Sequence, residues 1–175
     1  ELGILHAQSG RFREAVAVFE EVEARARKSG EAAGVVKAIY NRAVFHYRTG
    51  STDEAEDLFR RASRIAEECG LWTLSTSLWI GLAGTLRERG KLVEALRLYR
   101  RVLRLPAERH GNEQIVAHNN LAELYLALGS LYRALVHADL AVRTARRCGD
   151  RFRLGLTLRV RALVRWALGD DRRAR

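Results

Sequence analysis

The sequence is poor in residues that interrupt or cross-link a fold. Its 175 residues include one proline, two cysteines and no methionine. Because there is also no long Ser/Gly tract, no segment resembles a flexible linker, and we expect a single domain over residues 1–175. No apolar run approaches the roughly 18 residues of a membrane-spanning helix. The first ten residues also lack the basic start and cleavage site of a signal peptide. These absences predict a protein that does not enter a membrane.

The two cysteines, Cys69 and Cys148, are expected to be free thiols. They occupy matching positions in two different repeats of the pattern described below. A disulfide needs Cα atoms within about 7 Å, whereas two repeats of stacked helices would hold them roughly 20 Å apart. Two free thiols favour a reducing, cytoplasmic location.

The ends of the chain resemble the interior of a protein. There is no initiator methionine, the first residues already follow a helical pattern, and the last four are RRAR. We therefore expect this chain to be a piece of a longer protein. Apolar residues make up 47% and charged residues 30%, a balance that excludes a disordered segment.

Positive charge is concentrated in the second half of the chain. The net charge is +10, yet residues 1–90 carry 13 basic and 13 acidic side chains, and residues 91–175 carry 18 basic and 8 acidic ones. Only three of the 31 basic residues are lysines. An arginine bias of this kind is also typical of a GC-rich genome, so by itself it does not indicate a function.

Glycine recurs with a period of about 40 residues. The first series falls at intervals of 40, 40, 39 and 40 residues: Gly10, Gly50, Gly90, Gly129 and Gly169. A second series lies roughly midway between these glycines: Gly30, Gly70, Gly111 and Gly149. Between glycines, apolar residues are three and four apart, which predicts helices. Glycine just past a helix is a usual C-terminal stop. Each unit is therefore expected to be two helices joined by tight turns.

The expected helices cover most of the chain. Ser51 and Glu54 form a candidate capping box at one helix start, and Pro106 is expected to end a helix early, leaving an irregular joint at 105–111. The expected ranges are 1–8, 11–29, 31–48, 51–69, 71–89, 91–104, 112–128, 131–147, 150–168 and a stub from 171.

Residue size also repeats with the glycines. Seven positions before each glycine of the first series stands a small residue: Gly3, Ala43, Ala83, Ala122 and Ala162. Five positions after these glycines stands an alanine: Ala15, Ala55, Ala95 and Ala134. Leucine stands eight positions before three of these glycines, as Leu2, Leu82 and Leu121. An aromatic residue stands nine positions after three of them, as Phe19, Phe59 and Tyr99. This pattern resembles the tetratricopeptide repeat (TPR) family over essentially the whole chain. Departures are Arg42 and Arg161 in place of leucine, and Ala138 in place of the aromatic.

The resemblance implies an all-α, right-handed superhelical solenoid of antiparallel helix pairs, with about 4.5 repeats. The 40-residue period is similar to the long repeats of bacterial signalling regulators, quorum-peptide receptors and kinesin light chains. In such folds the first helix of each pair lines a concave groove that binds protein or peptide. The groove-lining helices here would be 31–48, 71–89, 112–128 and 150–168.

The position nine residues before each first-series glycine is the leading ligand candidate. It carries Asn41, Gly81, Asn120 and Val160. An asparagine there resembles the family residue that hydrogen-bonds a peptide backbone, since an amide both donates and accepts; the alternative is an asparagine bonded locally or to solvent. The other groove candidates are Lys37, Tyr40, Val44, Arg48, Ser77, Gly84, Arg87, Glu123, Arg159, Leu163 and Trp166.

Three features have two interpretations each. Gly81 and Gly84 either allow close approach of a ligand backbone or permit tight helix packing. Trp79 is expected in the core, whereas Trp166 lies near the C-terminal edge. At that edge Leu154, Leu158, Ala162 and Leu168 would be partly uncovered, so either further repeats follow or this end docks another chain, including a second copy.

Catalytic and cofactor motifs are absent from the sequence. There is no metal-ligand spacing among the five histidines and two cysteines, no phosphate-binding glycine loop and no nucleophile elbow. We expect no enzyme activity, no cofactor and no metal. The resulting hypothesis is a peptide- or protein-binding module within a regulatory protein.

A basic surface is the rival hypothesis. Two expected outer helices each carry several arginines: Arg97, Arg100, Arg101, Arg104; Arg143, Arg146, Arg147. They would bind an acidic partner or nucleic acid, or simply face solvent near helix C-termini. Aromatic residues are not interleaved with them, which disfavours nucleic acid.

Overall fold

The computed structural model describes residues 12–169, and within that range all regular secondary structure is helical. The helices are α2 (Phe12–Lys28), α3 (Ala32–Arg48), α4 (Thr52–Glu68), α5 (Trp72–Glu88), α6 (Leu92–Leu103), α7 (Ala107–Ala127), α8 (Leu131–Cys148) and α9 (Arg151–Ala167). The expected helix at 1–8 and the stub from 171 lie outside the described residues.

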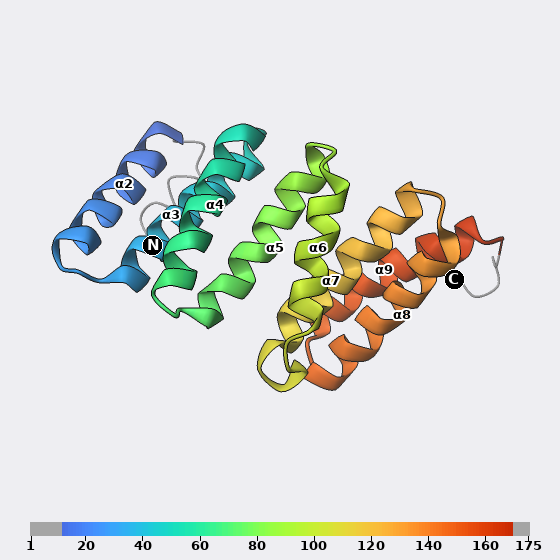
Figure 1. Ribbon diagram of the computed structural model, residues 1–175. Helices are drawn as coiled ribbons and strands as arrows, with labels where there is room; N and C mark the ends of the chain where they lie inside the picture. The colour runs from blue at the N-terminus through green and yellow to red at the C-terminus, as the bar shows by residue number, and fades with distance from the viewer. Residues whose placement is uncertain (1–11, 170–175) are drawn as a thin grey trace. The chain divides into compact units, whose positions relative to one another are not determined.

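The helices fall into two compact units, Glu1–Lys91 and Leu92–Arg175, called unit 1 and unit 2. Unit 1 contains α2 to α5, which follow one another as antiparallel neighbours (Figure 1). Unit 2 contains α6 to α9. The single domain expected over residues 1–175 stays a prediction.

The glycine turns are confirmed by their backbone geometry. At the end of α3, Gly50 has a φ of 86°, in the left-handed region that a residue without Cβ adopts readily. Gly50 N–H donates to the Tyr47 carbonyl (3.3 Å), and Ser51 N–H donates to the His46 carbonyl (2.9 Å). This paired pattern is a Schellman motif, which satisfies two carbonyls that the helix end would leave unpaired.

The joint at 105–111 differs from the expectation. Pro106 ends α6 but stands at the N-cap of α7, because its missing N–H costs nothing at a helix start. The following residues are helical up to a kink at His110 (φ −126°), so α7 begins five residues earlier than expected. Gly111 is not a helix stop. A Cβ there would lie 2.7 Å from the Cys148 sulfur, so glycine at 111 serves close packing.

The capping-box prediction is wrong in its hydrogen bonds. Ser51 does occupy the N-cap of α4, but its side chain makes no capping bond. A side-chain cap occurs instead at α9, where Asp150 Oδ1 accepts from the Arg153 backbone N–H at 2.8 Å. That bond lowers the pKa of the Asp150 carboxyl, since it favours the charged form.

The size pattern of the repeat places its small residues in the core. Nearly all of the described alanines of both alanine series are fully buried, Ala162 being half-buried: Ala15, Ala43, Ala55, Ala83, Ala95, Ala122, Ala134. The aromatic residues Phe19, Phe59 and Tyr99 are buried as well, as is Ala138 at the position where the aromatic is missing. Small side chains let the helices approach, and the aromatic rings fill the space between them.

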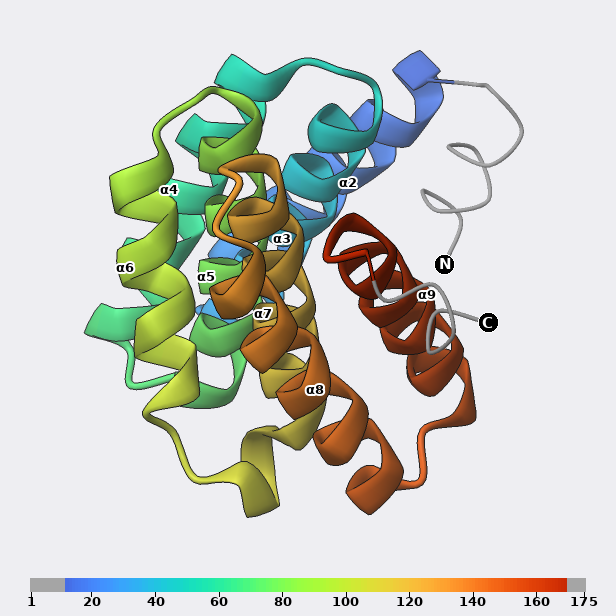
Figure 2. The ribbon, with the colours of Figure 1, turned by 90° about the vertical axis from the view of Figure 1, so that its right-hand side faces the viewer.

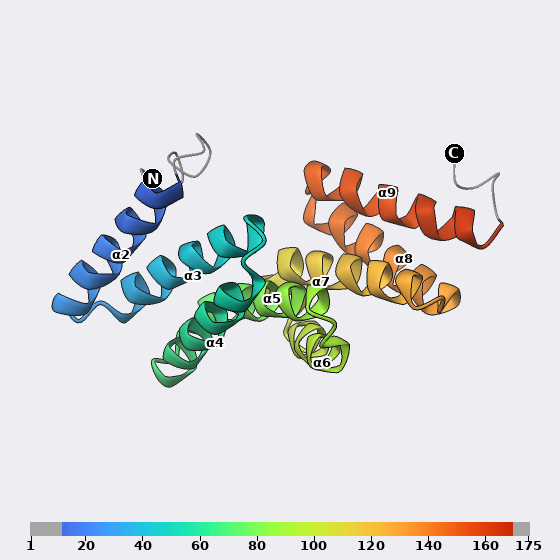
Figure 3. The ribbon, with the colours of Figure 1, turned by 90° about the horizontal axis from the view of Figure 1, so that it is seen from above.

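First helices of successive repeats pack on each other within each unit. In unit 1, α3 packs against α2, α4 and α5, so it lies between α2 and α4 (Figure 3). In unit 2, α7 packs against α6, α8 and α9 (Figure 2). The contacts α3–α5 and α7–α9 place these helices in an inner layer, where the resemblance puts the groove.

Two buried glutamates organise the polar contacts of unit 1. Glu56 on α4 is 4% exposed and pairs with Arg60 (2.8 Å), Lys91 (2.9 Å) and Arg89. Burial acts to raise the pKa of Glu56, but hydrogen bonds and charge from Lys91 and Arg60 outweigh it and hold the pKa below its ordinary value. Glu23 on α2 is similarly buried and pairs with Arg27 (3.0 Å), Arg42 (3.1 Å) and Arg61.

We expect Glu56→Gln to lower the free energy of unfolding by about 2 kcal/mol, because it leaves three cations without their shared anion. Urea denaturation at neutral pH measures this loss. Glu54→Gln is the matched control, since Glu54 is exposed on the same helix and should change stability by no more than about 0.5 kcal/mol. Equal effects of the two variants would contradict the role of the cluster.

The arginines that replace leucine are paired across helices in both units. Arg42 Nη2 lies 3.0 Å from Glu20 Oε1, and Arg161 Nη1 lies 3.7 Å from Asp139 Oδ1. Both pairs join a first helix to the helix before it, at equivalent repeat positions. The departure from the family pattern is therefore compensated by an acid on the neighbouring helix.

Candidate functional site

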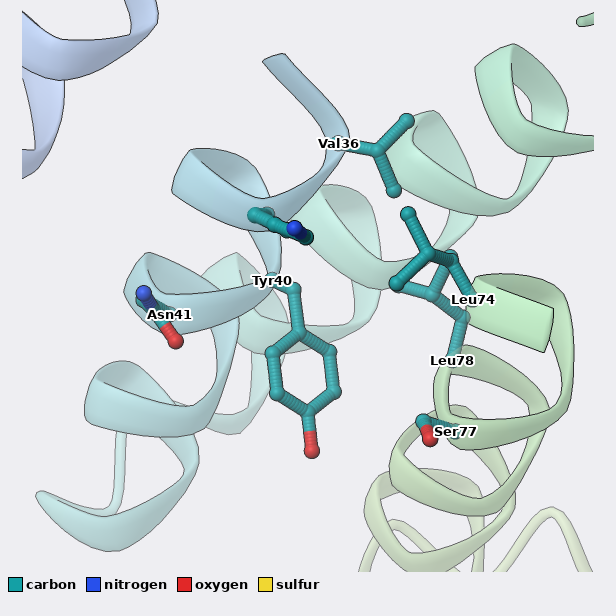
Figure 4. Close-up of a pocket in the computed structure, with 7 residues that line it drawn as sticks. Val36, Tyr40, Asn41, Leu74, Ser77 and Leu78 are labelled. Atoms are coloured by element: carbon teal, nitrogen blue, oxygen red, sulfur yellow. The ribbon is translucent and has the colours of Figure 1, made fainter. Parts of the chain in front are cut away.

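A pocket of about 300 Å³ opens between α3 and α5 in unit 1 (Figure 4). Four groove candidates line it: Lys37, Tyr40, Asn41 and Ser77. Its apolar wall is made by Val36 from α3 and by Leu74 and Leu78 from α5. In Figure 4, these three side chains lie on one side of the Tyr40 ring and Asn41 lies on the other.

Tyr40 is fixed in place by the core. Its ring meets Phe59 edge to face, with centroids 6.0 Å apart, and Phe59 is itself almost fully buried. Burial raises the pKa of the Tyr40 hydroxyl above its ordinary value, so the group stays neutral near pH 7. A neutral hydroxyl can both donate and accept a hydrogen bond at the pocket.

The remaining polar side chains are available to a ligand. Lys37 is exposed and places an ammonium at the rim. Asn41 is half-buried and makes no side-chain hydrogen bond with any residue in the described part of the chain. An apolar wall beside an amide, two hydroxyls and one cation suits a peptide side chain with its flanking backbone and a nearby carboxylate.

The other groove candidates of unit 1 lie outside the pocket. Val44 is half-buried and Arg48 exposed on α3, and Arg87 is half-buried on α5. Gly81 packs under Phe59, because a Cβ there would lie 2.5 Å from Phe59 Cζ. A Cβ at Gly84 would meet only the Tyr47 hydroxyl at 3.6 Å, an ordinary contact. Close helix packing therefore explains Gly81 but is not required at Gly84.

Asn120 in unit 2 is bonded differently from the equivalent Asn41 in unit 1. Asn120 Nδ2 donates to the hydroxyl of Tyr99 at 3.2 Å, and Tyr99 is fully buried. Glu123 lies 3.8 Å from Arg159, so these two candidates pair with each other. Leu163 and Trp166 on α9 are exposed, Trp166 at 67%.

Sequence reasoning missed the apolar wall of the pocket. Val36 adjoins Lys37 on α3, and Leu74 and Leu78 flank Ser77 on α5. These residues follow the ordinary core periodicity, and Val36 and Leu78 are themselves 1% exposed, so nothing in the sequence separates them from other core positions. The signal that would have indicated the wall residues is their position beside Lys37 and Ser77 on the same helices.

Several other predictions can be placed on the structure. Cys69 and Cys148 are free and exposed, as expected. Trp79 is a core residue whose Nε1–H donates to Glu67 (3.0 Å), and the edge residues Leu154, Leu158, Ala162 and Leu168 are half-buried. Within residues 12–169, no cluster of three metal-ligating side chains occurs, and no helix is long and apolar enough to cross a membrane.

A histidine pair joins α7 to α8 in unit 2. The Nδ1 atoms of His118 and His137 are 2.9 Å apart, and His137 stacks on Tyr125 with ring centroids 5.5 Å apart. Burial, the neighbouring His137 and Arg143 lower the pKa of His118 to about 4. Burial and Arg100 also lower the pKa of His137. Neutral rings are therefore favoured, with one Nδ1 donating to the other.

The chain is similar in sequence to known helical-repeat families. The profile described as "MalT-like TPR region" matches residues 30–175, and the profile described as "Tetratricopeptide repeat" matches residues 1–21. A search of curated proteins found no significant match.

Solved structures share the arrangement of helices at low sequence identity. BtubC (BKLC) from P. vanneervenii is 23% identical with a TM-score of 0.76, over 99% of this chain and 72% of that one. A putative kinesin light chain with nearly identical TPR-like repeats from Podosopora anserina is 21% identical with a TM-score of 0.73, over 99% and 87%. The apo quorum sensor NprR from B. thuringiensis is 14% identical with a TM-score of 0.50, over 99% and 61%. These likenesses concern the fold.

Proposed function

Because this chain belongs to the family of MalT-like TPR regions, we propose that it is a protein-recognition module and that unit 1 binds a peptide segment in the pocket between α3 and α5. The fold is an all-α, TPR-type helical-repeat solenoid, as the sequence indicates. Repeat scaffolds of this type act by binding, and we propose no catalytic step for the chain.

One observation supports the pocket most strongly. Four residues expected in the groove from the family resemblance, Lys37, Tyr40, Asn41 and Ser77, line the same cavity. Their helices α3 and α5 belong to the inner layer of unit 1. In the proposed complex, a ligand side chain packs on Leu74 above the buried Val36 and Leu78, and the amide of Asn41 bonds the ligand backbone.

A regulatory context is proposed from the family and from one neighbour. The NprR structure with the same fold is described as a quorum sensor. By analogy, we propose that peptide binding by this chain serves a regulatory protein.

We expect Asn41→Ala to weaken binding of a selected peptide about fivefold to tenfold, since it removes hydrogen bonds worth roughly 1 kcal/mol to the ligand backbone. Peptides would be selected from a displayed library against the purified chain, and their Kd measured by fluorescence anisotropy. Leu74→Asp should abolish binding, because it puts a charge on the apolar wall.

Two asparagine variants serve as controls. Asn112 is exposed on α7, so Asn112→Ala should leave both Kd and Tm unchanged. Asn120→Ala should lower Tm, because it removes the hydrogen bond from Asn120 to the buried Tyr99 hydroxyl, and should leave the Kd of a pocket-bound peptide unchanged. Selected peptides that bind Asn41→Ala and Leu74→Asp as tightly as the original chain would refute the pocket.

A further inference from the structure

The outer face of unit 2 carries a set of exposed arginines on two helices. We call it the arginine face; its members are Arg97, Arg100, Arg101, Arg104, Arg143, Arg146 and Arg147. Within residues 12–169, all of them except Arg101 lack an ion-pair partner. Unit 1 differs, since its acids Glu23 and Glu56 each hold three cations.

Repeat equivalence explains this difference between the units. Val93 and Arg97 on α6 occupy the positions that Asp53 and Asp57 occupy on α4, one 40-residue period earlier. An arginine further along the outer helix is present in three successive repeats, as Arg64, Arg104 and Arg143. Unit 2 thus keeps the cations of the outer helix and replaces these two acids, so its outer helices carry an excess of positive charge.

Exposed apolar side chains accompany the arginines. Val93 stands four residues before Arg97 on α6, and it is 64% exposed. On α8, Tyr132 is 81% exposed and Val136 is 57% exposed, and their spacing to Arg143 and Arg147 keeps all four on one side of the helix. Each outer helix therefore presents apolar contact area in its first half and positive charge in its last turns.

The helices that carry the two arginine rows are both neighbours of α7. Within unit 2, α6 and α8 each pack against α7. The two rows therefore lie on helices that flank the same helix.

We propose that the arginine face, with Val93, Tyr132 and Val136, binds an acidic amphipathic segment of a partner protein. The guanidinium groups would hold carboxylates in bidentate contacts, and the exposed valines and tyrosine would cover the apolar side chains of the segment. Nucleic acid fits less well, because a phosphate backbone offers no partner for the exposed valines and the arginines lack interleaved stacking platforms. This surface is separate from the pocket in unit 1.

The test uses fluorescence anisotropy with the full chain at about 0.15 M salt. The first probe is a labelled helical peptide with Glu on one face and Leu on the other. The second is the same peptide with Ser in place of Leu, and the third is a DNA duplex of similar charge. We expect the Glu/Leu peptide to bind at least about tenfold tighter than the Glu/Ser peptide and tighter than the duplex.

Matched charge reversals locate the contact. Arg143→Glu should weaken binding of the Glu/Leu peptide at least about tenfold. Arg64→Glu, at the equivalent position of unit 1, should weaken its binding less than about twofold. Leu74→Asp should have no effect, so failure of the pocket proposal leaves this one standing. Equal losses in Arg143→Glu and Arg64→Glu, tighter binding of the duplex, or no binding of the Glu/Leu peptide would each overturn the proposal.

Discussion

Acidification from about pH 7.5 to about pH 5 is expected to lower the free energy of unfolding by about 2 kcal/mol through His118 alone. The loss rises to about 3 kcal/mol near pH 4. The folded pKa is about 4, against 6.5 for the ordinary side chain. The unfolded chain therefore takes up a proton in this range that the folded chain excludes. The stability is fully present above about pH 6.5 and is lost as the pH falls toward 4.

The surroundings of the pair explain the direction. The Nδ1 atoms of His118 and His137 face each other at 2.9 Å, so two protonated rings would place like charges in contact. Arginines add to this effect: Arg143 and Arg100 act on the pair, and Arg133 lies over the Tyr125 ring on which His137 stacks.

Urea denaturation at several pH values measures this effect, with His118→Gln as the comparison. Glutamine retains a donor and an acceptor for His137 but does not titrate. The variant should lose about 2 kcal/mol less than the original chain between pH 7.5 and 5. Carboxylate titration is common to both proteins and cancels in the comparison. Identical pH profiles would show that the pair does not exclude protons.

Gly81→Ala is expected to lower the free energy of unfolding by about 2 kcal/mol, the second large effect. The new Cβ would lie 2.5 Å from Phe59 Cζ, and overpacking of a core typically costs up to about 3 kcal/mol. The better helix propensity of alanine returns about 1 kcal/mol. Because Phe59 meets Tyr40 edge to face, displacement of its ring also disturbs the pocket.

Gly84→Ala provides the matched control three residues along α5. A Cβ at Gly84 has only an ordinary contact with Tyr47, so the substitution should stabilise the chain by about 0.5–1 kcal/mol. Phe59→Leu combined with Gly81→Ala should show a coupling energy above about 1 kcal/mol in a double-mutant cycle. Strict additivity, or stabilisation by Gly81→Ala, would contradict the packing role assigned to Gly81.

Much of the fold could be predicted because the repeat signal is local. The left-handed turn at Gly50 and the burial of Ala55 and Phe59 follow from positions counted along the chain. The joint after Pro106 was not predictable in the same way. A proline ends one helix and equally well starts the next, and the pattern of residues 105–111 does not say how soon the new helix begins.

The candidate site was predicted in its polar part only. Lys37, Tyr40, Asn41 and Ser77 could be chosen because they lie on helices that the family resemblance assigns to the groove. The apolar wall could not be chosen, because Leu74 and Leu78 have the same spacing as core residues. Asn41 and Asn120 are equivalent in sequence, yet only Asn120 donates to a tyrosine. The difference comes from the residue opposite, which lies on another helix.

The sequence by itself determined the helical repeat, its period, its turns and the identity of its small and large core residues, since each depends on the spacing of residues along one helix. Only the tertiary structure decided which side chains meet across helices. Phe59 over Gly81, Glu56 with Arg89 and Lys91, and His118 against His137 are such pairs. These pairings depend on the rotation and offset of neighbouring helices, which residue spacing within either helix does not specify.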